Sequence, residues 1–231
     1  MIWLTGDTHG HFERIEAFCR ARQTTRDDLL VILGDSGFNF GGSERDLALK
    51  TQAARFPVTI LSLHGNRENR PQNIPGYVEG EFCGGKILYE PQFPNLLFAV
   101  DGEVYRLGGK DCLAVGGAYS TGKESRLAKG MGWWPDEQPS EETKRRVERL
   151  LDVRGWQMDL VLTHTCPLRY KPLEALKPDL DQSTVDSTTE EWMDEIELRL
   201  RYARWYCGHF HTDKTVGRLR ILFREIVELE G

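Results

Sequence analysis

The sequence predicts an α/β fold whose strands deliver polar side chains to one edge, and two observations support this prediction. Apolar runs alternate with charged, amphipathic segments over residues 1–66, which is the β-α-β-α-β order of a parallel sheet covered by helices. In addition, five apolar runs are each followed by Asp, Asn or His; the runs lie at residues 1–5, 29–33, 58–63, 160–163 and 205–207. Because open α/β sheets bind ligands at the carboxyl ends of their strands, the second observation predicts a site at that edge.

The first apolar run ends just before Asp7 and His9. Residues two apart on a strand point to the same face, so this carboxylate and this imidazole are expected to face one way. Taken alone, the pair also fits an ordinary polar turn after a strand. The rest of the chain favours a ligand site, because all six histidines lie in or beside the ends of the apolar runs.

Helices and strands are expected to alternate up to residue 66. Apolar residues recur at helical spacing over residues 11–23, starting with Phe12 and Ile15, which predicts a surface helix. The continuous apolar run Leu29–Leu33 is typical of a strand that is buried on both faces. The next two predicted elements are a charged helix over 43–55 and a buried strand over 58–63.

Residues 67–95 break this alternation. They contain four prolines and the Gly84–Gly85 pair, so we expect an irregular loop region on the substrate side. Short strands follow, with Asp101–Gly102 as a hairpin turn. They predict a second, largely antiparallel sheet built from residues 87–89, 96–100, 103–107 and 112–115.

Capping signals mark two further helices. Ser140 is placed to cap a helix over 140–153, and acidic residues follow it in the first turn. Ser187 and Glu190 have the spacing of a capping box, which predicts the start of another helix. The remaining predicted elements are a strand over 159–163 and a closing hairpin over 213–229.

Length and composition indicate a soluble globular protein with one domain over residues 1–231. The net charge of −6 makes an extended nucleic acid an unlikely partner and favours a small substrate. Five cysteines without a C-x-x-C pair point to a reducing compartment, and Cys166 and Cys207 are expected to be small core residues. We find no membrane-spanning segment and no signal peptide, and therefore expect a cytoplasmic protein. The oligomeric state stays open.

The ordered series Asp-x-His, Gly-Asp, Gly-Asn, His and Gly-His-x-His resembles the calcineurin-like metallophosphoesterase family from residue 5 to residue 211. The resemblance implies a four-layer α-β-β-α sandwich of two mixed sheets, with a dimetal site at the carboxyl ends of the strands. It also implies hydrolysis of phosphomonoesters or phosphodiesters by a hydroxide that bridges two metal ions. The expected substrate is a small phosphorylated compound or a phosphoprotein.

The same resemblance assigns the metal ligands. Asp35 would bridge two divalent ions such as Mn, Fe or Zn. Imidazole and carboxylate ligands suit these ions, and the absence of thiolates from the set argues against a closed structural zinc site. The first ion would be completed by Asp7, His9 and His211, and the second by Asn66, His164 and His209.

One position departs from the family pattern, which usually reads Gly-Asn-His followed by an acidic residue. This chain has Arg67 after Asn66. Arginine stays protonated and cannot donate a proton to a leaving group, but it can clamp a phosphate oxygen. His64 is the candidate for the lost acid, and its alternative is a polar residue at the end of a strand. The substitution also allows a second function, in which the fold binds a partner without turnover.

Residues 117–124 nearly match the phosphate loop of nucleotide triphosphatases. Glu124 stands where a hydroxyl should bind Mg²⁺, and nearby glycines spoil the required helix, so we reject that interpretation. Two alternatives remain for this segment. Lys123, Arg126 and Trp133–Trp134–Pro135 either close over the metal site or are surface cations and core tryptophans.

Overall fold

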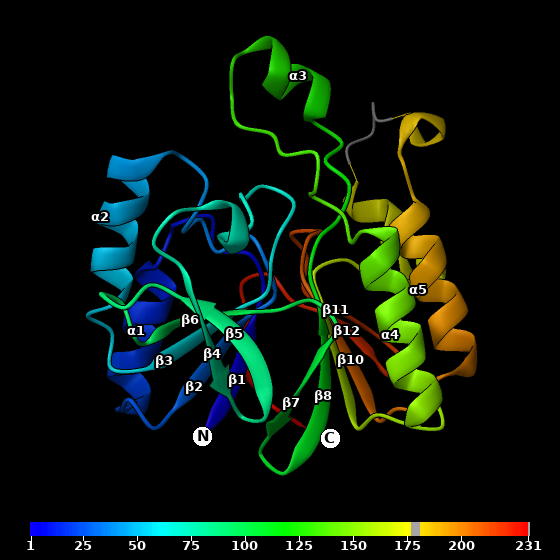
Figure 1. The fold of residues 1–231 in the computed structure, drawn as a ribbon, viewed down its shortest axis with the longest axis horizontal. Helices are drawn as coiled ribbons and strands as arrows, with labels where there is room; N and C mark the ends of the chain where they lie inside the picture. Colours follow the sequence, from blue (N-terminus) through cyan, green and yellow to red (C-terminus); the bar gives the residue numbers. More distant parts are fainter. Residues whose placement is uncertain (177–180, 231) are drawn as a thin grey trace.

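Two β-sheets lie face to face, with helices on their outer faces (Figure 1). The computed structural model describes residues 1–176 and 181–230. Helices α1 (Glu13–Arg22) and α2 (Ser43–Ala53) cover the first sheet, and α4 (Glu141–Val153) and α5 (Thr188–Arg199) cover the second. The predicted four-layer α-β-β-α sandwich of two mixed sheets is therefore confirmed.

The first sheet has seven strands in the order β13-β1-β2-β3-β6-β5-β4. Its centre is parallel, and Thr5, Ile32 and Ser62 lie side by side in the register. The chain therefore leaves three neighbouring strands at one level of the sheet. The strands are β1 (Ile2–Thr5), β2 (Leu29–Ile32), β3 (Thr59–Ser62), β4 (Val78–Phe82), β5 (Gly85–Tyr89), β6 (Leu96–Ala99) and β13 (Ile226–Glu228).

The second sheet has six strands in the order β11-β12-β10-β9-β8-β7. Thr163 and Cys207 are paired at the ends of its two central parallel strands, so the residues that follow them leave the sheet together. The strands are β7 (Glu103–Leu107), β8 (Lys110–Val115), β9 (Leu160–Thr163), β10 (Arg204–Cys207), β11 (Lys214–Val216) and β12 (Leu219–Ile221).

Alternation along the strands builds the core on both faces of each sheet. In the second strand, Leu29, Val31 and Leu33 face the other sheet, while Leu30 and Ile32 face the covering helices. All five side chains are buried, as expected for a strand between two layers. On the far side, the second sheet packs against α4 and α5 through a separate apolar cluster.

The strand assignment after residue 66 was wrong in several respects. Residues 67–95 hold a regular hairpin, β4–β5, and β5 and β6 belong to the first sheet. The turn at Asp101–Gly102 connects the two sheets, because β6 and β7 lie in different ones. The second sheet is also mixed and not largely antiparallel. Short apolar strands fit either sheet, so the partner of each strand depends on long-range packing.

The helix caps and the tail were predicted in part. Ser140 caps α4, since its Oγ accepts a hydrogen bond from the Thr143 amide at 3.1 Å. The capping box at Ser187 is wrong, because Asp186 accepts the Thr188 amide and Glu190 is buried. In the tail, β11 and β12 form a hairpin, but β13 pairs with β1 in the other sheet.

Shorter elements connect the layers. They are α3 (Lys123–Ala128) and the 3-10 helices η1 (Pro71–Asn73), η2 (Leu168–Tyr170), η3 (Leu173–Ala175) and η4 (Gln182–Thr184). Figure 1 shows α3 projecting beyond the ends of the strands. Within the described ranges, no helix has the length and apolar character that crossing a membrane requires. All five cysteines are free, and Cys166 and Cys207 are fully buried, as expected.

Candidate metal centre

The predicted ligands meet where the carboxyl ends of the parallel strands of both sheets face each other. Several of them have a left-handed backbone, which costs energy in residues other than glycine. Of the seven described non-glycine residues with positive φ, four are predicted ligands: His9, Asp35, His209 and His211. The sharp turns after the strands thus aim these side chains inward at the expense of local strain.

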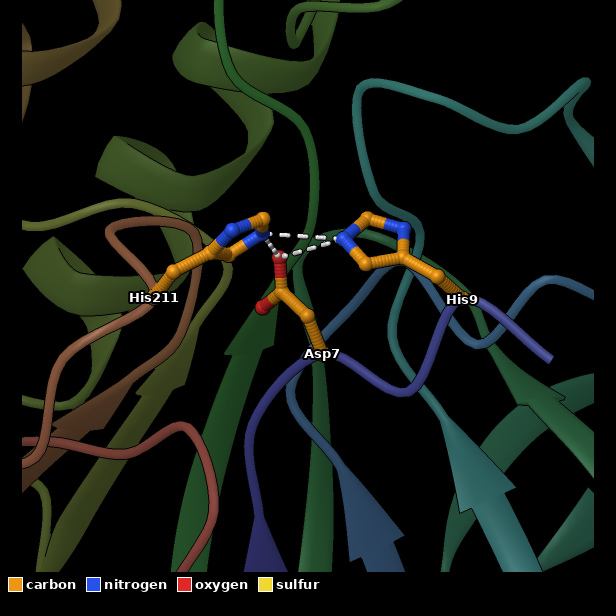
Figure 2. Close-up of side chains that lie close together, drawn as sticks. All are labelled: Asp7, His9 and His211. Carbon is orange, nitrogen blue, oxygen red and sulfur yellow. Dashed lines mark hydrogen bonds and ion pairs between the residues drawn. The ribbon is translucent and has the colours of Figure 1, made fainter. Parts of the chain in front are cut away.

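Asp7, His9 and His211 form the first group of donor atoms (Figure 2). The Nε2 atoms of the two histidines lie 2.9 Å apart, and His211 Nε2 lies 3.1 Å from Asp7 Oδ2. His9 Nε2 is 3.6 Å from the same carboxylate oxygen. Two strands of different sheets supply the group, because Asp7 follows β1 and His211 follows β10.

Asn66, His164 and His209 form the second group. Asn66 Oδ1 lies 2.9 Å from His164 Nε2 and 3.1 Å from His209 Nδ1. An amide oxygen and two ring nitrogens therefore point at one small volume. His164 is fully buried and Asn66 is nearly so, whereas His209 is partly exposed.

Asp35 lies between the two groups. Its Oδ2 atom is 3.8 Å from His9 Nδ1 in the first group and 4.0 Å from His164 Nε2 in the second. The backbone fixes this position, because the Asp35 carbonyl accepts hydrogen bonds from the amides of Thr8 and His9. Its Oδ1 atom accepts a third hydrogen bond from the Arg67 amide at 2.8 Å.

Two glycines give these side chains the space they need. A Cβ atom on Gly34 would overlap the His164 ring at Nδ1, and Gly34 also has a φ of +97°. A Cβ atom on Gly65 would overlap Asp35 Oδ1. The glycines in the Gly-Asp and Gly-Asn pairs therefore serve close packing around the ligands.

Burial and neighbouring charges set the protonation of the group. Burial lowers the pKa of His209 to about 3, so its ring is neutral and keeps a free lone pair. Although burial raises the pKa of Asp7, the hydrogen bond with His211 and the nearby histidine charges bring it below its ordinary value. The hydrogen bond with Asp7 in turn raises the pKa of His211.

The donor set fits divalent metal ions. Two carboxylates, an amide oxygen and four imidazoles converge, and thiolates take no part, although buried Cys166 and Cys207 lie next in the chain to His-bearing turns. Oxygen and nitrogen ligands of this kind suit Mn, Fe, Zn and similar ions. The structure thus brings together all the residues that were predicted as metal ligands.

Arg67 and His64 occupy different places. Arg67 lines a cavity of about 390 Å³ together with His9, Phe40 and Arg45. His64 is 3% exposed and lines a separate cavity that also includes Arg70 and Asp101. Its ring nitrogens have no hydrogen-bond partner among the described residues. Burial and the charge of Arg70 lower the pKa of His64 well below its ordinary value.

Within residues 117–135, the side chain of Ser120 contacts the candidate ligand Asn66. Ser120 Oγ accepts a hydrogen bond from Asn66 Nδ2 at 2.8 Å and another from Arg126 at 3.1 Å. Lys123 instead places its ammonium 4.1 Å above the Trp133 ring. The helix that starts at Lys123 has only six residues, so the phosphate-loop interpretation fails here also.

Sequence reasoning missed three residues that support the ligands. Arg14 donates to the carbonyls of Gly6 and Asp7. Glu68 accepts hydrogen bonds from Ser36 Oγ and from the Gly37 amide. Ser120 holds Asn66, as described above. Only Glu68 had a signal in the sequence, since it directly follows Asn66 and Arg67.

Comparison with known proteins agrees with this geometry. The family model described as calcineurin-like phosphoesterase matches residues 1–213. A search of curated proteins found no match.

Two solved structures resemble the chain. The crystal structure of TT1561 of Thermus thermophilus has a TM-score of 0.53 and 14% sequence identity, and the alignment covers 96% of this chain and 87% of that one. At this identity the likeness concerns the fold alone. The protein of unknown function AQ665 from Aquifex aeolicus has 14% identity, a TM-score of 0.29, and coverage of 71% of this chain and 80% of that one.

Proposed function

The chain belongs to the calcineurin-like phosphoesterase family, and we propose that it accordingly hydrolyses phosphomonoesters or phosphodiesters with the help of two divalent metal ions. The observation that carries the proposal is the position of Asp35 between two groups of donor atoms. Its Oδ2 atom is within 4.0 Å of a ring nitrogen from each group. A carboxylate in that position can bind two ions at once.

Divalent ions at such a site lower the pKa of water and neutralise negative charge on a phosphoryl group. The protein contributes the placement of the donors and of the substrate. The hydrogen bond between Ser120 and Asn66 orients the amide oxygen toward the histidines. The Arg67 amide donates a hydrogen bond to Asp35, and this fixes the backbone of Arg67 relative to the carboxylate that would bridge the ions.

Arg67 is the residue that we assign to the phosphate. It lines the same cavity as His9, and its guanidinium carries a fixed positive charge. A guanidinium can hold two phosphate oxygens, and this orients the ester for in-line attack. A cavity of about 390 Å³ suits a small phosphorylated compound or a phosphorylated side chain.

A second candidate function rests on the same residue. Arg67 replaces the histidine usual at this position, so a protonating imidazole is missing there. The fold would then hold metal ions and bind a phosphorylated partner without releasing product.

Hydrolysis by the metal-loaded protein distinguishes the two functions. The protein is loaded with Mn²⁺, Fe²⁺ or Zn²⁺ and assayed with aryl and alkyl phosphate monoesters and diesters, with Asp35→Asn as the inactive control. We expect turnover that the control lacks. Binding of phosphate esters without turnover on any of them would support the binding-only function.

A further inference from the structure

Three arginines surround the ring of Phe40 beside the metal centre. The guanidinium carbons of Arg45, Arg67 and Arg126 lie 5.4, 5.5 and 5.6 Å from the ring centroid. They come from three separate parts of the chain: helix α2, the loop after β3, and helix α3. We refer to Arg45, Arg67 and Arg126 as the arginine cluster.

The cluster gathers three positive charges around one aromatic ring. Across residues 1–176 and 181–230, none of the three arginines forms an ion pair with a carboxylate. Arg126 is only 7% exposed, and its Nε has no hydrogen-bond partner among the described residues. Burial, followed by the charge of Arg67, lowers the pKa of Arg126. The positive charges of the cluster repel one another, and an anion bound among them would relieve this repulsion.

Hydrogen bonds hold part of the cluster in place. Arg126 donates to Ser120 Oγ at 3.1 Å and to the carbonyl of Gly132. Ser120 also bonds to Asn66, so one hydroxyl links the cluster to the candidate metal ligands. A guanidinium fixed in this way loses little further freedom when it binds an anion.

Two residues of the cluster line a cavity together with the candidate metal ligand His9, and Arg126 adjoins it through its contact with Phe40. Arg45, Arg67 and Phe40 line it together with His9, and exposed Met131 lies at its rim. Arg67 alone can bind one phosphate at the metal centre, because a single guanidinium can donate hydrogen bonds to two phosphate oxygens. Arg45, which also lines the cavity, is then left for a second anionic group on the same molecule.

We propose that Arg45 binds a further phosphate on the leaving group, with Arg126 adding positive charge beside it, so that the preferred substrates carry at least two phosphates. This inference rests on the proposed phosphoesterase function, because it assigns the reacting phosphate to the metal centre. The Phe40 ring supports the Arg45 guanidinium through a cation–π contact and leaves its N–H groups for the anion. Arg45 is therefore a specificity-determining residue, and Arg126 acts through its charge.

Binding to the metal-free protein tests the cluster without hydrolysis. Inorganic tripolyphosphate is titrated calorimetrically into EDTA-treated protein. We expect Arg45→Ala to weaken binding about tenfold, the effect of losing one charge-assisted contact. The matched control is Arg149→Ala, which removes the same charge from an exposed position on α4. Absence of binding, or equal weakening in both variants, would overturn the proposal.

Kinetics separate this inference from the proposed function. The metal-loaded protein is assayed with phenyl phosphate and with 1,3-phenylene bisphosphate, which differ by one phosphate. We expect the ratio of kcat/KM for the bisphosphate to kcat/KM for phenyl phosphate to exceed the statistical factor of about two. In Arg45→Ala, this ratio should fall about tenfold. A kcat/KM ratio no greater than about two refutes the second-phosphate site and leaves the phosphoesterase function intact. If neither ester is hydrolysed while tripolyphosphate binding still depends on Arg45, the proposed function fails and the anion site stands.

Discussion

His164 Nδ1 lies 2.7 Å from the carbonyl oxygen of Leu33, and this contact joins the end of a strand in one sheet to the end of a strand in the other. A carbonyl only accepts hydrogen bonds, so Nδ1 carries the proton and Nε2 keeps its lone pair. That lone pair faces Asn66 and Asp35. The contact therefore leaves Nε2 of His164 oriented as a metal ligand would need it.

We expect the purified protein to bind about two divalent ions per chain after mild loading. His164→Ala removes a fully buried ligand of the second group, so its metal content is expected to fall to about one ion. Elemental analysis by plasma mass spectrometry measures the content. His11→Ala is the matched control, because His11 lies outside both donor groups. A native protein without metal would contradict the assignment.

Asp35→Asn is expected to cost more activity than His9→Ala. A bridging carboxylate serves both ions, whereas His9 serves one, and a neutral amide bridges poorly. The measurements are kcat/KM on an aryl phosphate and the metal content of both variants. Equal losses in the two variants would show that Asp35 does not bridge.

Arg67 is expected to make the rate depend steeply on the leaving group. General acid catalysis is typically worth about 10² to 10⁴-fold, and a guanidinium cannot supply it. Aryl esters should therefore be cleaved far better than alkyl esters. Arg67→His should improve alkyl esters more than aryl esters, as read from kcat/KM over a series of graded leaving-group pKa.

The same series tests whether His64 is the acid. In that case native protein would cleave alkyl esters well, and His64→Ala would lose activity mainly on them. The separate cavity around His64 makes us expect similar losses on both ester types.

Glu68→Gln is expected to change how stability depends on pH in the metal-free protein. Burial and the nearby Asp35 raise the pKa of Glu68 from 4.5 to about 8. The folded state then holds a proton that the unfolded state releases, so this group makes stability fall as pH rises from about 4.5 to about 8. Glutamine cannot ionise and removes this contribution. Urea unfolding of both proteins at pH 5 and pH 8 measures the difference, and an equal fall in both would contradict the prediction.

Ser140→Ala is expected to lower the free energy of unfolding by about 1 kcal/mol, because it removes the hydrogen bond that caps α4. Activity per folded molecule should not change, since α4 covers the outer face of the second sheet. Denaturant unfolding tests this, with Ser125→Ala on exposed α3 as the control. A loss as small as that of the control would mean that the cap adds no stability.

The class of fold, and which donor side chains converge at one place, could be predicted from the amino-acid sequence alone. The order of the ligands along the chain was readable because a strand ends where its apolar run ends, and the ligand types follow directly. The helix caps show how far such local reasoning extends. The cap at Ser140 depends only on a hydrogen bond within the first turn of its own helix. The side chain of Glu190, in contrast, accepts a hydrogen bond from distant Thr165 and not from the start of its helix. The single domain, the phosphorylated partner and the cytoplasmic location stay predictions.

The folded structure was needed to show which sheet each short strand joins and which residues surround the ligands. β5 and β6 extend the first sheet because their apolar side chains fill its two faces, a matter of long-range packing that no local pattern encodes. Likewise, Arg45 and Arg126 meet Arg67 around Phe40 only when distant loops fold together. The local sequence determines which donor atoms follow each strand. The packing of distant segments determines the distances between these atoms and the charged residues around them.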